Sequence, residues 1–164
     1  MKTLLLVRHA KSSYDSPAQP DFGRTLNERG QRDAPEMARR LLEKDFRIDA
    51  FITSPAKRAL NTCKYFVKVY AREEEDIVQK PELYLAPVAA FYRVIGGIDD
   101  SLDNIALFAH NDGITDFANK LTNIQIDNMP TCGIFAVRTA IDTWEEFEDA
   151  KKEFLFFDYP KNKS

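Results

Sequence analysis

The chain contains only two histidines, and each follows directly after a short apolar run that has the character of a β-strand. His9 follows the run at residues 4–7 and stands beside Arg8, and His110 follows the run at residues 105–109. In an open parallel sheet, side chains just past the carboxyl ends of the strands face the crevice in which ligands bind. A histidine in such a crevice can attack a phosphoryl group whose negative charge a neighbouring arginine offsets. The two histidines therefore indicate both a location and a chemistry.

A second basic pair stands where a helix is expected to begin. Ser54 has the type of an N-cap and Pro55 that of a first helical residue, so Lys57 and Arg58 fall in the first helical turn. Cations at that position oppose the helix dipole, at a cost of a few tenths of a kcal/mol, unless an anion lies nearby. Free backbone N–H groups at a helix N-terminus bind phosphate readily. The competing interpretation is a pair of solvated surface charges, and we assign Lys57 to that class.

The residues after His110 follow the same logic. Asn111 or Asp112 can cap the next helix and direct its N-terminus at the same crevice. A lone histidine at a strand end is more often a packed structural residue, so it is the joint occurrence with His9 and two arginines that favours a functional site. The two histidines could share a metal ion with acids such as Asp112 or Asp116, but the arginines would repel a divalent cation. We therefore predict no metal and no cofactor.

Other common sites are absent from the sequence. It has no G-x-x-x-x-G-K-[ST] loop, no G-x-G-x-x-G after a strand and no H-E-x-x-H helix. It also lacks the G-x-S-x-G turn of the serine hydrolases. Nucleotide binding through these loops, zinc proteolysis and serine hydrolysis are accordingly not supported.

The elements that must position these side chains alternate between strand and helix, which is the pattern of an α/β fold with a largely parallel sheet. Strands are predicted at residues 2–7, 50–53, 77–79 and 105–109, and helices from residues 25–28 towards 43, from 55 onward, over 87–98 and over about 114–121. The first helix is opened by the capping-box spacing of Thr25 and Glu28, and Pro35 predicts a kink or break inside it. The tail, at residues 133–137, 143–146 and 154–157, is predicted to add short strands.

Composition limits the class of protein. At 164 residues, with 44% hydrophobic and 30% charged residues, we expect a soluble single domain over residues 1–164. The net charge of −3 argues against a nucleic-acid partner. The apolar run at residues 4–7 is shorter than a secretory segment of roughly 7–15 residues or a membrane span of about 20, so we expect no membrane association. Cys63 and Cys132 form no disulfide framework, which favours a cytoplasmic location.

At four places the sequence resembles a known family. The motifs, in chain order, are Arg8-His9, Asp21-x-x-Arg24-x-Leu26-x-x-x-Gly30, Ser54-Pro55-x-x-Arg58-Ala59-x-x-Thr62 and Ala109-His110-Asn111-Asp112-Gly113. The first, third and fourth resemble the signature of the histidine phosphatase superfamily, and the second, with the short length, is similar to the SixA-type phosphohistidine phosphatases. The resemblance implies a three-layer α/β/α sandwich with a mostly parallel central sheet.

The resemblance also implies a role for each site residue. His9 would be the nucleophile and would carry the phosphoryl group transiently. Arg8 and Arg58 would clamp the phosphoryl oxygens, Arg24 would add a further phosphate contact, and His110 would stabilise charge on the group in transfer. In the last motif Ala109 replaces the usual glycine, and the following acidic residue stands where proline is common.

A proton donor for the leaving group is not evident from the sequence. Glu82 or Asp112 could serve, although Glu82 fits a surface charge better. An ester oxygen needs such an acid, whereas an imidazole leaves more easily because its nitrogen can be protonated near neutral pH. We therefore expect a metal-independent phosphohistidine phosphatase acting on a protein such as a phosphotransfer domain. The alternatives are a phosphatase of small phosphate esters or sugar phosphates and a non-catalytic module that binds phosphorylated ligands. The sequence leaves the oligomeric state open.

Overall fold

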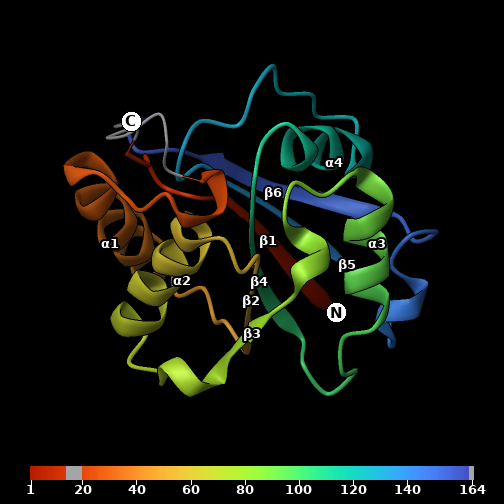
Figure 1. Cartoon of the computed structure of the whole chain (residues 1–164). Coiled ribbons are helices and arrows are strands. Elements are labelled where there is room, and N and C mark those ends of the chain that lie inside the picture. Colours follow the sequence, from red (N-terminus) through yellow and green to blue (C-terminus); the bar gives the residue numbers. More distant parts are fainter. Residues whose placement is uncertain (14–19, 163–164) are drawn as a thin grey trace.

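A computed structural model describes residues 1–13 and 20–162, and its described part is built around a twisted central sheet (Figure 1). The six strands lie in the order β3-β2-β4-β1-β5-β6. Their bounds are β1 Lys2–Arg8, β2 Ala50–Thr53, β3 Ile77–Gln79, β4 Asn104–Ala109, β5 Ile134–Thr139 and β6 Lys152–Asp158. Strands β1 to β4 pair in parallel, β5 runs antiparallel to β1, and β6 antiparallel to β5. The prediction of a mostly parallel sheet is confirmed.

Helices cover both faces of this sheet. Their bounds are α1 Glu28–Glu43, α2 Lys57–Val69, α3 Val88–Gly96 and α4 Gly113–Leu121. Successive side chains of a strand point to opposite faces. Leu5 and Val7 of β1 accordingly pack in the core cluster with α1 and α2, and Leu4 and Leu6 in the cluster with α3 and α4 (Figure 1). Burial on both faces explains the uninterrupted apolar run, and it confirms the three-layer α/β/α sandwich.

The prediction of a strand at residues 143–146 is wrong. Short 3-10 turns occur at η1 Asp21–Gly23, η2 Glu74–Asp76, η3 Pro81–Leu83 and η4 Trp144–Glu146. At η4 the Glu146 carboxylate accepts hydrogen bonds from the Thr143 backbone N–H at 2.9 Å and from its hydroxyl at 3.0 Å. These contacts close a capped turn in which an extended strand cannot form.

Helix α1 begins and continues differently from the prediction. Its N-cap is Asn27, whose side-chain oxygen accepts a hydrogen bond from the Gly30 N–H at 2.9 Å, so the assignment of Thr25 as the cap is wrong. The break expected at Pro35 does not occur, and the helix runs through it. A proline removes one intrahelical hydrogen bond, and the buried apolar side of the helix, including Met37 and Leu41, packs on the sheet and offsets that loss.

Helix α2 also begins later than predicted. Ala56 is its N-cap and Lys57 its first residue, so the assignment of Ser54 as N-cap and Pro55 as first helical residue is wrong. The Ser54 hydroxyl oxygen still accepts a hydrogen bond from the Ala56 N–H, at 3.3 Å, but Ser54 lies two residues before the cap. Among the described helices, none is long and apolar enough to cross a membrane.

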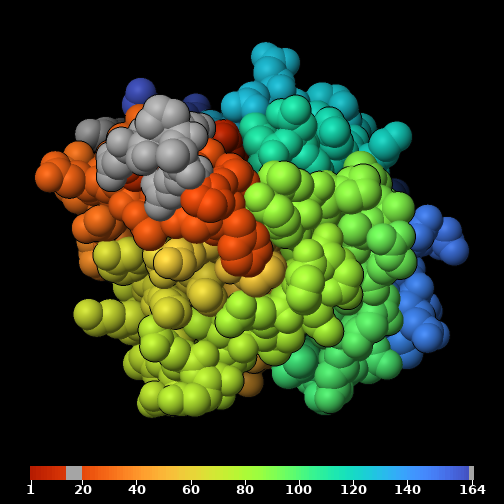
Figure 2. All heavy atoms as spheres, viewed as in Figure 1, coloured from red at the N-terminus to blue at the C-terminus, as the bar shows by residue number. Residues whose placement is uncertain are grey.

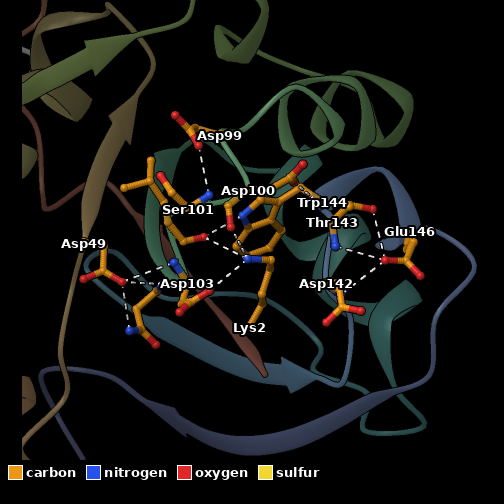
Figure 3. A network of polar contacts seen from close by, with 12 residues as sticks. Lys2, Asp49, Asp99, Asp100, Ser101, Asp103, Asp142, Thr143, Trp144 and Glu146 are labelled. Carbon is orange, nitrogen blue, oxygen red and sulfur yellow. Dashed lines mark hydrogen bonds and ion pairs between the residues drawn. The ribbon is translucent and has the colours of Figure 1, made fainter.

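The amino end of β1 is fixed by a buried lysine (Figure 3). Lys2 is 2% exposed, and its ammonium group donates hydrogen bonds to the Asp100 carbonyl at 2.7 Å and to the Asp103 carboxylate at 2.9 Å. It also lies 5.4 Å from the centre of the Trp144 ring. These contacts join β1 to the segment before β4 and to η4, at the end of the sheet opposite the histidines.

Candidate active site

The two histidines meet because β1 and β4 are neighbours in the sheet. The parallel register pairs Arg8 with Ala109, so His9 and His110 leave their strands at the same edge. The His9 backbone N–H donates to the Ala109 carbonyl at 3.1 Å, and the ring centres lie 5.3 Å apart. His9 is 6% exposed and His110 is 2% exposed. Both side chains therefore stand at the carboxyl edge of parallel strands, where an open α/β sheet binds ligands.

His9 is held in one orientation with one nitrogen engaged. Its Nδ1 lies 2.8 Å from the Ala10 carbonyl oxygen, to which it donates as the Nδ1–H tautomer. The proton on Nδ1 leaves Nε2 with its lone pair. Burial lowers the pKa of His9 to about 3, against the hydrogen bond to the Ala10 carbonyl; repulsion from His110 when both rings are protonated and the positive charges of Arg58 and Arg8 act in the same direction as burial. The ring is therefore neutral at physiological pH, which is the form of imidazole that attacks phosphorus.

His110 is the second neutral imidazole. Its Nε2 lies 2.7 Å from the Ser54 hydroxyl, and its buried Nδ1 has no hydrogen-bond partner among the described residues. Burial, followed by the charge of Arg58, lowers the pKa of His110 to about 3. When the Ser54 hydroxyl donates to Nε2, Nδ1 carries the ring proton. The ring can then donate a hydrogen bond to an oxygen of a bound ligand.

One cavity contains all five residues that the sequence singled out. It measures about 220 Å³ and is lined by Arg8, His9, Lys11, Ser12, Asp21, Arg24, Arg58, Leu85, His110, Asn111 and Thr131. On the face shown in Figure 2, the orange-red N-terminal segment meets the green segment after η3 and the teal region of α4. A larger groove of about 510 Å³ lies along α2 near Lys64 and Lys68 and contains neither histidine.

Two of the arginines are placed by the core and by the backbone. Arg58 is 3% exposed in the first turn of α2, and Lys57 beside it is exposed and does not line the cavity. Arg8 donates from Nη1 to the Met129 carbonyl at 2.7 Å, which ties the end of β1 to the segment before β5. Both guanidinium groups thus lie in the cavity wall, where their positive charge faces the space that an anion would occupy.

All three guanidinium nitrogens of Arg24 donate hydrogen bonds to residues nearby in the sequence. Its Nε donates to the Ser13 carbonyl at 3.2 Å, its Nη1 to the Asp21 carboxylate at 2.9 Å, and its Nη2 to the Ser12 hydroxyl. The structure brings Arg24 to the cavity as expected, and these three contacts stabilise the wall. A direct phosphate contact by Arg24 stays a prediction.

Asp21 is the residue of this cavity that the sequence analysis did not single out. In the sequence Asp21 is only the first position of a motif, but it is the one carboxylate that lines the cavity among residues 1–13 and 20–162. The available signal was its spacing to Arg24, because an acid and a base three residues apart can pair within one turn. The two acids that were considered, Glu82 and Asp112, are both exposed and do not line the cavity.

The wall opposite α2 depends on a close backbone approach. A Cβ atom at Gly113 would lie 1.9 Å from the Ala86 carbonyl oxygen, so only glycine allows α4 to begin against the segment that precedes α3. That segment carries Leu85 into the cavity rim with a φ of 50°, which is a left-handed conformation rare for a leucine. Tyr84 beside it packs edge-on against His110, with ring centres 5.6 Å apart.

Comparisons with known proteins show which sequences and which fold this chain resembles. The family profile of the histidine phosphatase superfamily (branch 1) matches residues 4–84. An uncharacterized chloroplastic protein of Arabidopsis thaliana is 25% identical over 160 residues, which cover 88% of this chain and 70% of that protein. Two solved structures share the fold. The protein histidine phosphatase SixA complexed with tungstate is 18% identical, covers 99% of both chains and has a TM-score of 0.82. A mycobacterial glucosyl-3-phosphoglycerate phosphatase is 15% identical, covers 97% of this chain and 100% of its own, and has a TM-score of 0.72.

Proposed function

Because this chain belongs to the histidine phosphatase superfamily, we propose that it hydrolyses phosphohistidine in a protein substrate, with His9 as the nucleophile. The observation that carries the proposal is the state of His9. Its Nδ1–H is engaged by the Ala10 carbonyl, its pKa is lowered to about 3, and its Nε2 is left as a neutral nucleophile in a cavity lined by arginines.

The reaction then has two balanced steps. The His9 Nε2 lone pair forms a bond to phosphorus while the P–N bond of the substrate breaks, and the departing imidazole nitrogen takes up a proton from solvent. Water then attacks phosphorus, the bond to Nε2 breaks, and the inorganic phosphate that leaves retains the oxygen and the hydrogens of that water. Arg8 and Arg58 offset the charge of the phosphoryl oxygens in both steps, and the Nδ1–H of His110 donates to one of them.

The choice of substrate follows from the acids near the cavity. Glu82 and Asp112 do not line it. Burial alone would raise the pKa of Asp21, but hydrogen bonds from Tyr84 and Arg58 hold that pKa below its usual value, so Asp21 is ionised and is a poor proton donor. A leaving alkoxide needs an acid far more than a leaving imidazole does. This difference supports phosphohistidine over a phosphate ester.

The mouth of the cavity supports a protein as the carrier of the phosphohistidine. Leu85 at the rim is 55% exposed, and Phe22, which packs edge-on against Tyr84 with ring centres 5.1 Å apart, is 44% exposed. A sugar phosphate would leave these apolar side chains in water, whereas a protein surface can cover them. The second candidate substrate is a small phosphate ester, and the shared fold with a glucosyl-3-phosphoglycerate phosphatase is the observation that favours it.

We further propose that catalysis needs no metal ion, because the arginines around His9 would repel a divalent cation. The chain would act as one domain over residues 1–164 in the cytoplasm, and its two cysteines, free and buried, suit a reducing compartment. Dialysis against a chelator should leave the rate unchanged. Loss of activity that zinc, magnesium or manganese restores would overturn this part of the proposal.

Rapid quench tests the nucleophile. With a labelled substrate, the wild-type protein should yield an acid-labile, alkali-stable adduct, and the His9→Ala protein should yield none. Equal labelling of the variant would refute the assignment.

A substrate panel tests the reaction class. We expect kcat/KM to be highest for a phosphohistidine domain, lower for an aryl phosphate and lowest for a sugar phosphate, with little change in Glu82→Gln. Preference for the sugar phosphate, together with its loss in Glu82→Gln, would favour the ester reaction instead.

A further inference from the structure

Asp21 is bonded to more members of the cavity wall than any catalytic role assigned above requires. Its carboxylate accepts hydrogen bonds from Arg58 Nη2 at 2.9 Å, from Arg24 Nη1 at 2.9 Å and from the Tyr84 hydroxyl at 2.6 Å. Its backbone carbonyl accepts a fourth, from Arg58 Nη1 at 2.7 Å. One residue thus connects η1, the first turn of α2 and the segment after η3.

The two bonds from Arg58 fix the plane of its guanidinium group. They leave from both terminal nitrogens and end on two different atoms of Asp21, so the group can neither rotate about its long axis nor withdraw. A guanidinium carries five N–H donors, and these two bonds use two of them. Arg58 therefore keeps donors for phosphoryl oxygens while its orientation is already set, which reduces the entropy lost when an anion binds.

Tyr84 holds Asp21 from the other side. Its hydroxyl donates to the same carboxylate oxygen, Oδ2, that Arg58 Nη2 contacts, and its ring packs against His110. The Asp21 side chain is 42% exposed, so without these partners the carboxylate would sample several rotamers in water. The ring contact with His110 also links the position of Asp21 to the catalytic edge of the sheet.

We propose that Asp21 is a positioning residue that orients Arg58 and Arg24 for the phosphoryl group, and that Tyr84 holds Asp21 in place. The proposal rests on the phosphatase function given above, because it presumes that an anion binds between the arginines and His9. A bound phosphoryl group would replace none of the four contacts, since it would use the donors that Asp21 leaves available on Arg58.

The test measures anion binding directly, so it does not depend on turnover. The dissociation constant of inorganic phosphate should rise on the order of 10-fold in Asp21→Ala and less in Asp21→Asn, which keeps one acceptor oxygen. Asp49→Asn is the matched control. Asp49 also has a lowered pKa, which burial opposes and Asn104 and Arg47 produce, and it lies before β2 at the opposite edge of the sheet. Its phosphate affinity should equal that of the wild type.

A pH profile separates positioning from a general loss of structure. If ionised Asp21 orients Arg58, the acid limb of kcat/KM reports the Asp21 carboxylate together with His9, which must be neutral to attack. Tyr84→Phe removes a hydrogen bond that lowers the pKa of Asp21, so the part of the limb due to Asp21 should move to higher pH. In Asp21→Asn only the part due to His9 should remain. A merely structural contact would leave the limb where it is.

Each result has one consequence. Weaker phosphate binding in Asp21→Ala, with the shifted limb in Tyr84→Phe, supports the proposal. Unchanged or tighter phosphate binding in Asp21→Ala would show that Asp21 competes with the anion for the arginines, and would overturn it. If the wild-type protein itself binds no phosphate, the proposed function fails and the positioning role fails with it.

Discussion

Acidification from about pH 8 to about pH 5 should destabilise this protein through its two histidines. Burial lowers the pKa of both His9 and His110 from the ordinary 6.5 to about 3. The two histidines are therefore protonated below about pH 6.5 in the unfolded chain, but only below about pH 3 in the folded chain. For a group whose folded pKa is lowered, the stability is fully present above the unfolded pKa and is lost as the pH falls toward the folded pKa.

The magnitude follows from the two pKa values. Lowering the pH from about 8 to about 5 decreases the free energy of unfolding by about 2 kcal/mol for each histidine, and therefore by about 4 kcal/mol for both. The chain has no other histidine. Asp21 and Asp49, whose pKa values are lowered from 3.8, titrate below this interval and contribute little to it.

Urea unfolding of the wild type, His9→Asn and His110→Asn at both pH values provides the measurement. Each substitution should reduce the pH-dependent loss by about 2 kcal/mol, whatever its pH-independent cost. Asp49→Asn is the control and should show the full wild-type loss. If His9→Asn loses as much stability on acidification as the wild type, His9 is not a neutral buried imidazole and the argument for its nucleophilicity falls with it.

Two further substitutions have defined outcomes. Arg58→Ala should lower turnover on the order of 10²–10³-fold if Arg58 stabilises transition-state charge. Lys57 is its exposed neighbour, and Lys57→Ala should leave turnover unchanged. Equal rates for the two variants would favour the interpretation of Arg58 as a surface charge. Lys2→Met should lower the free energy of unfolding by about 1–3 kcal/mol, because the carbonyls of Asp100 and Leu102 lose a buried donor. It should leave kcat/KM unchanged, because the length of β1 separates Lys2 from the cavity. Urea unfolding without a shift in midpoint would contradict the role of Lys2 shown in Figure 3.

Local sequence patterns predict most of the strands and helices of this fold. Uninterrupted apolar runs predicted β1 and β4 because a strand covered on both faces has no polar alternation. The helix predicted at residues 87–98 ends two residues earlier, at Gly96, and the strand ends placed both histidines at the catalytic edge. Exact helix starts were harder: Asn27 and Thr25 both have residue types that cap helices, and Ala56 caps α2 without a side-chain hydrogen bond although Ser54 has the better capping type. The choice among neighbouring caps depends on tertiary packing.

The chemistry of the cavity depends on partners that are distant in the sequence. The sequence by itself determined that His9, Arg58 and His110 stand at element ends suited to a phosphate. Only the tertiary structure decided that Asp21 accepts hydrogen bonds from Arg58, which lies 37 residues away in the sequence, and that Glu82 remains outside the cavity. The physical reason is that strands and helices repeat with a fixed period that the sequence displays. A loop such as the one around Asp21 has no period, and its path is set by the partners it finds in the folded chain.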